Sequence, residues 1–62
     1  MQNLDFLFAV AYLYALENVD LHKMQPIMVG KFPSIPAITV FRVCAKAYVK
    51  RVNELNQALL IR

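Results

Sequence analysis

The second half of the chain, residues 34–62, reads SIPAITVFRVCAKAYVKRVNELNQALLIR. Large or apolar residues recur in it at alternating steps of three and four, which is the spacing of a heptad repeat. The repeat consists of Ile38, Phe41, Ala45, Tyr48, Val52, Leu55 and Leu59. This spacing predicts one long amphipathic helix with an apolar stripe along one side. We expect a partner to cover that stripe.

Two prolines mark the start of this helix. Ser34 is the predicted N-cap, and Pro36 is tolerated in the first turn because the amide that it lacks is unpaired there in any case. A helix that starts at Ile35 and runs to Ile61 is about 40 Å long.

A first helix is predicted to begin near Leu4, with Asn3 as its N-cap and Asp5 in its first turn. Every residue from Phe6 to Leu16 is apolar or Tyr, so we expect this helix to be surrounded on all faces and to form the centre of the structure. It is expected to fray between residues 20 and 24, before Pro26.

Residues 25–33 connect the two predicted helices. Pro26 suits the first position of a short helical turn and Gly30 suits its end. The predicted fold is therefore all-α: an antiparallel helical hairpin with a short helical turn in the connection, in a single small helical domain of residues 1–62. The second helix is longer than the first, which leaves Leu55 and residues 59–61 projecting without cover from their own chain.

The composition also predicts association. The chain has 62 residues and is 60% hydrophobic, above the roughly 45–50% of globular domains, yet a chain of this size has little interior. A second copy is the first candidate to cover the surplus, since a symmetric dimer needs only one self-complementary patch. We expect two copies to form a helix bundle. The expected dimer or partner interface comprises Phe8, Tyr12, Phe41, Tyr48, Val52, Leu55 and Leu59.

Charge is distributed unevenly along the chain. Residues 1–20 contain three acidic residues and no Lys or Arg, whereas residues 21–62 contain seven basic residues and one acidic residue. The residues that could bind an anion are Arg42, Lys46, Lys50 and Arg51. A plain solvated face explains their spacing better, because the aromatic residues typical of single-strand binding do not alternate with them.

The sequence contains no pattern for catalysis, metal binding or a cofactor. His22 is the single histidine and Cys44 the single cysteine, too few for a metal site that needs three or four ligands. We interpret His22 as an exposed residue at the C-terminal end of the first helix, and Cys44 as a small buried hydrophobe. One cysteine allows no intrachain disulfide, which favours a reducing, cytoplasmic setting. The apolar run from residue 6 to residue 16 is short for a membrane span of about 20 residues.

These features favour a small non-enzymatic interaction protein, a dimeric regulator or adaptor that binds another protein. One alternative is a nucleic-acid-binding regulator that uses the basic stripe of the second helix. A further alternative is a helical peptide that lies on a membrane surface, with residues 6–16 in the headgroup region.

Overall fold

Three helices account for most of the chain in the computed structural model, which describes the backbone of residues 3–61 and the side chains of residues 3–60. Helix α1 spans Leu4–Leu16, α2 spans Leu21–Lys31 and α3 spans Ala37–Ile61. The described residues contain no strand, so the predicted all-α class is confirmed.

Helix α1 begins as the sequence predicts. The side chain of Asn3 accepts a hydrogen bond of 3.1 Å from the backbone N–H of Phe6, and Asp5 lies in the first turn. The helix ends at Leu16, and Asn18 in the following turn has a φ of 64°. Asn is among the residues that tolerate this left-handed conformation best, so it can reverse the chain here.

The connection between α1 and α3 contains a full helix, and the prediction of a single helical turn is wrong. The Asp20 side chain accepts a hydrogen bond from the backbone N–H of His22, which makes Asp20 an N-cap that starts α2. His22 therefore lies in the first turn of α2, not at the C-terminal end of the first helix. Pro26 is inside α2, where it removes one backbone hydrogen bond. Gly30 is within the helix and does not end it.

Helix α3 begins two residues later than predicted. Ile35 precedes a proline, and the proline ring disfavours helical dihedral angles at the residue before it. The carbonyl of Pro36 instead accepts the first bonds, from the N–H groups of Thr39 at 3.0 Å and Val40 at 3.1 Å. Ser34 lies three residues before the first residue of α3, so it is not the N-cap that the sequence suggested.

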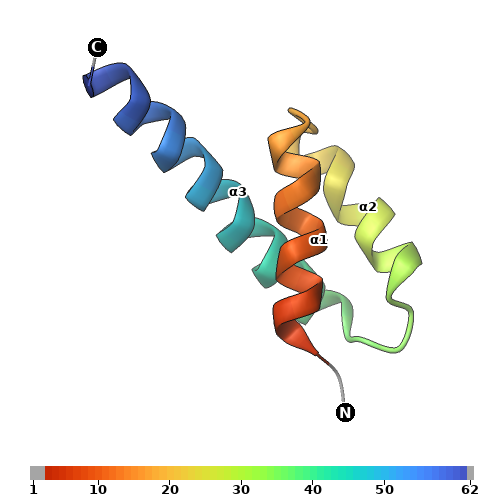
Figure 1. The fold of residues 1–62 in the computed structure, drawn as a ribbon. Coiled ribbons are helices and arrows are strands. Elements are labelled where there is room, and N and C mark those ends of the chain that lie inside the picture. The colour runs from red at the N-terminus through yellow and green to blue at the C-terminus, as the bar shows by residue number, and fades with distance from the viewer. Residues whose placement is uncertain (1–2, 62) are drawn as a thin grey trace.

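The two long helices do not form an antiparallel hairpin. Figure 1 shows that α2 runs back along α1, so α3 starts near the beginning of α1 and runs in the same general direction, at an angle to it. Contacts at both ends agree with this path. Near the start of α1, the rings of Phe6 and Phe32 meet edge to face, with centroids 6.0 Å apart. At its end, Ala15 lines a small hollow together with Tyr48 and Leu55 of α3.

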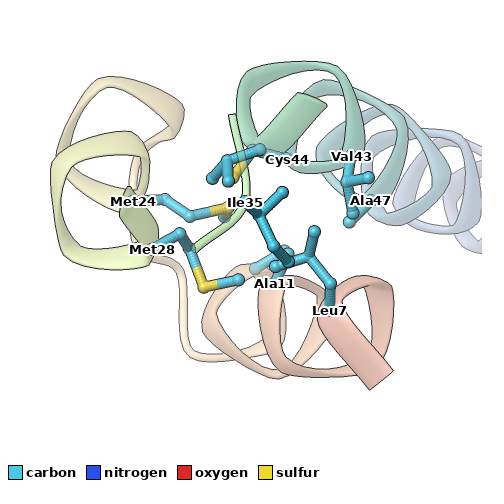
Figure 2. Close-up of a cluster of buried hydrophobic side chains, with 10 residues drawn as sticks. Leu7, Ala11, Met24, Met28, Ile35, Val43, Cys44 and Ala47 are labelled. Carbon is cyan, nitrogen blue, oxygen red and sulfur yellow. The ribbon is translucent and has the colours of Figure 1, made fainter. Parts of the chain in front are cut away.

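The core lies where the three helices meet (Figure 2). Its ten side chains are Leu7, Ala11, Ala15, Met24, Met28, Ile35, Val40, Val43, Cys44 and Ala47. Cys44 is completely buried, as predicted. Burial raises the pKa of its thiol because the thiolate would lose solvation.

Helix α1 is not surrounded, contrary to the prediction. One face of it packs in the core through Leu7, Ala11 and Ala15, while Phe6 and Leu13 on the other side are exposed. Two neighbouring helices cover only one side of α1. Its uniform apolar character therefore leaves an apolar outer face on the molecule.

Candidate interaction surface

Helix α3 has two apolar sides, and its own chain covers only one. The covered side consists of Val40, Val43, Cys44 and Ala47. The heptad residues lie mainly on a neighbouring side of the helix, because each residue turns the helix by about 100°. We call these heptad residues the α3 stripe: Ile38, Phe41, Ala45, Tyr48, Val52, Leu55 and Leu59.

Much of the α3 stripe is exposed. The exposed fractions are 59% for Ile38, 39% for Phe41, 37% for Val52, 43% for Leu55 and 65% for Leu59. Ala45 and Tyr48, in the middle, are half-buried. Monomeric soluble proteins rarely expose continuous apolar surface on this scale, and a stripe from Ile38 to Leu59 is about 32 Å long.

The C-terminal part of α3 projects beyond α1 and α2 (Figure 1). Near its end, Leu59 is 65% exposed, and Leu60 is the most exposed large hydrophobic residue described. The expected lack of cover is therefore confirmed for Leu59 and Leu60, whereas Leu55 lines the hollow beside Ala15 and is less exposed. The side chain of Ile61, which was expected to project with them, lies outside the described residues.

The remaining expected interface residues, Phe8 and Tyr12, lie on α1 beside α3. Their rings stack on each other with centroids 6.4 Å apart, and both side chains are half-buried against the core. Tyr12 contacts Lys50 and Glu54, which are not part of the α3 stripe. The polar end of Tyr12 therefore contacts residues of α3 outside the stripe.

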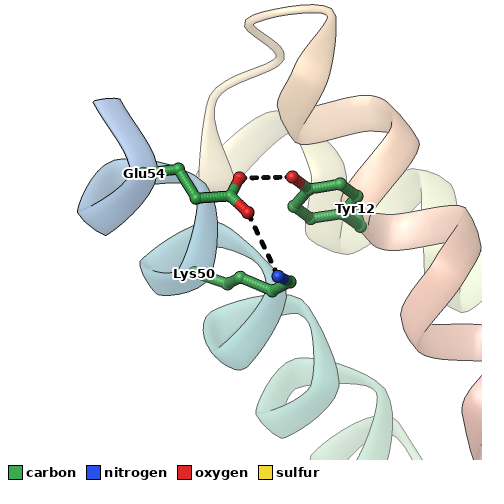
Figure 3. A network of polar contacts seen from close by, with 3 residues as sticks. All are labelled: Tyr12, Lys50 and Glu54. Carbon is green, nitrogen blue, oxygen red and sulfur yellow. Dashed lines mark hydrogen bonds and ion pairs between the residues drawn. The ribbon is translucent and has the colours of Figure 1, made fainter. Parts of the chain in front are cut away.

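A polar network joins α1 to α3 through Tyr12, Lys50 and Glu54 (Figure 3). The Tyr12 hydroxyl donates a hydrogen bond to one carboxylate oxygen of Glu54. The Lys50 ammonium lies 3.1 Å from the other carboxylate oxygen and 5.3 Å from the centroid of the Tyr12 ring. Sequence reasoning missed this network, because only the four-residue spacing of Lys50 and Glu54 is visible in the sequence.

The network shifts the pKa values of its members. The hydrogen bond from Tyr12, followed by that from Lys50, lowers the pKa of Glu54 because both stabilise the carboxylate. The same hydrogen bond to Glu54 raises the pKa of Tyr12, since the donor must keep its proton. Glu54 likewise raises the pKa of Lys50, first through their hydrogen bond and then through its charge.

The four candidate anion-binding residues differ in their surroundings. Arg42 and Lys46 are exposed. Lys50 is paired with Glu54, which offsets its charge. Arg51 is half-buried, and its Nε atom is buried without a hydrogen-bond partner. The structure therefore does not present four equivalent cations along α3, and an extended phosphate contact has less support than the sequence suggested.

The described part of this surface holds no cluster of metal-ligating side chains. Within residues 3–60, no three His, Cys, Asp or Glu side chains gather closely enough to hold a metal ion. The hollow beside Lys46, Val49 and Asn53 is lined by α3 alone, so it is an open helix face and not a cleft between elements. In the part of the chain that the structure describes, no helix combines the length and apolar character needed to cross a bilayer.

Comparisons of the chain with protein-family models, curated proteins and solved structures find no match.

Proposed function

We propose that this chain is a small helical interaction protein, a dimeric regulator or adaptor that acts by binding another protein. The observation that carries the proposal is the exposed α3 stripe. Covering it removes apolar surface from water, which is the main favourable contribution to protein association. The heptad spacing is the pattern that helices use to pack along one another.

The outer face of α1 supports the second part of the proposal. Phe6 and Leu13 are more than half exposed, and Leu16 is 38% exposed. This face belongs to a different helix from the stripe, so a dimer formed through α3 would still have apolar surface with which to dock on another protein. Aromatic residues such as Phe6 are enriched at the centres of protein interfaces.

Two aspartate substitutions at the end of α3 test the role of the stripe. Leu55→Asp puts a charge on the stripe, whereas Leu60→Asp puts the same charge on an exposed position outside it. We expect Leu55→Asp to dissociate the dimer because a buried unpaired charge is strongly unfavourable, and Leu60→Asp to remain dimeric. Sedimentation measures both. Equal masses for the two variants would contradict the proposal.

Docking on another protein is tested with Leu13→Asp, which changes the outer face of α1. We expect the variant to remain a dimer but to lose a binding protein that the unaltered chain captures and that Leu60→Asp still captures. Retention of the same protein by Leu13→Asp would contradict docking through this face.

A further inference from the structure

The shape of the α3 stripe restricts what can cover it. A stripe that repeats every 3.5 residues along about 32 Å matches another helix of similar length. Helices α1 and α2 have 13 and 11 residues, whereas α3 has 25. The one described element of this chain long enough to cover the stripe is α3 of a second copy.

The order of large and small residues decides the direction of pairing. If two α3 helices run in the same direction in register, Ala45 faces Ala45 and the adjacent layer places Tyr48 against Tyr48. One layer is then underfilled and the next is crowded, which disagrees with the close packing of protein interiors.

An antiparallel pair gives layers of similar volume. With the two helices centred between residues 46 and 47, Ala45 of one copy faces Tyr48 of the other. In the same register, Phe41 faces Val52, and Ile38 faces Leu55. Each of these layers combines one residue from the first half of the stripe with one from the second half, whereas Leu59 extends past the start of the second copy's α3 at Ala37.

The flanking charges permit the arrangement. Arg42 follows Phe41 on one edge of the stripe, and Arg51 precedes Val52 on the other edge. In the antiparallel register, Arg42 faces the region of Val49 and Asn56 of the second copy. No cation at the edge of one stripe is opposite a cation of the other.

We propose that the α3 stripe is covered by the α3 stripe of a second copy that runs in the opposite direction, with Ala45 of each copy packed against Tyr48 of the other. This inference rests on the proposed function, because it specifies how the dimer forms.

Thiol cross-linking of full-length chains tests the direction. Ile38→Cys and Leu55→Cys are prepared separately, mixed, and treated with a short bismaleimide. In the antiparallel dimer, residue 38 of one copy is beside residue 55 of the other, whereas two residues 38 are about 25 Å apart along the axis. We expect covalent dimers from the mixture and almost none from either variant alone. The unaltered chain, whose Cys44 is buried, is the control.

Cross-linking of each variant with itself would overturn the antiparallel direction and leave the dimer intact. Sedimentation of the variants before the bismaleimide is added separates this result from a failure of the dimer. Monomers at all concentrations would overturn both the direction and the dimeric part of the proposed function. If either substitution weakens association, Phe41→Cys with Val52→Cys tests the same register at the neighbouring layer.

Discussion

The hydroxyl of Tyr12 donates a hydrogen bond to the carboxylate of Glu54, 42 positions further along the chain. This bond fixes the last part of α1 against α3 close to the point where α3 leaves the three-helix body (Figure 3). It therefore contributes to the angle at which the projecting part of the stripe is held.

We expect Tyr12→Phe to lower the stability of the fold slightly. The variant keeps the ring and its stacking on Phe8 but removes the bond to Glu54. Urea unfolding followed by circular dichroism should show a lower midpoint with an unchanged slope. Tyr14→Phe, at another half-buried position of α1, is the matched control. A midpoint equal to that of the control would show that the bond contributes nothing.

Acid should destabilise the fold through Glu54. The pKa of Glu54 is lowered below its ordinary value of 4.5 in the folded chain, chiefly by Tyr12 and then by Lys50. A carboxylate with a lowered pKa stabilises the folded state above its unfolded pKa, and this stabilisation is lost as the pH falls through the folded pKa. We expect the urea midpoint to fall as the pH drops below about 4.5.

Glu54→Gln is the test of that assignment, because it removes the titrating group and keeps the shape. The variant should lose less stability than the unaltered chain over the same acid range. An identical loss in both proteins would assign the acid sensitivity to another carboxylate.

We expect Pro26→Ala to stabilise the protein. Pro26 is the sixth residue of α2, where a proline costs about 3 kcal/mol, offset by about 1 kcal/mol because it restricts the unfolded chain. The net gain should be about 2 kcal/mol in the free energy of unfolding. Pro33→Ala, outside the helices, should give no such gain. A destabilised Pro26→Ala variant would contradict the strain assigned to this position.

Leu7→Ala should remove a large part of the stability. Leu7 is completely buried, whereas Leu13 on the same helix is 60% exposed. Replacing a buried leucine by alanine costs about 2–5 kcal/mol, so urea unfolding should show a loss of that size for Leu7→Ala. Leu13→Ala should have a much smaller effect. Similar losses for both would mean that α1 packs through a different face.

The sequence predicted the features that depend on local chemistry. Asn3 as a cap, the helix start at Leu4 and the burial of Cys44 are all found in the structure, whereas the first helix ends at Leu16, before the predicted range of residues 20–24. The boundary errors also have local causes. Asp20 forms a cap that starts a new helix, and Ile35 cannot be helical before Pro36. The inserted helix α2 reverses the chain once, so α3 runs in the same general direction as α1. The predicted hairpin is wrong because the sequence interpretation lacked this extra helix.

The candidate surface was harder to predict. The heptad stripe is visible in the sequence, but a second apolar set at Val40, Val43 and Ala47 packs in the core. Periodicity cannot say which of two adjacent apolar sides a chain will bury against itself. The bond between Tyr12 and Glu54 was also beyond prediction, because it depends on the packing of two helices that are distant in sequence.

The molar mass of the purified chain in detergent-free buffer tests whether a second copy covers the α3 stripe. It is measured by sedimentation over a wide concentration range, with far-ultraviolet circular dichroism on the same samples. The exposed α3 stripe predicts a helical dimer that persists to low concentration. A fully helical monomer at every concentration would contradict it, because the stripe would then remain in water without a second copy.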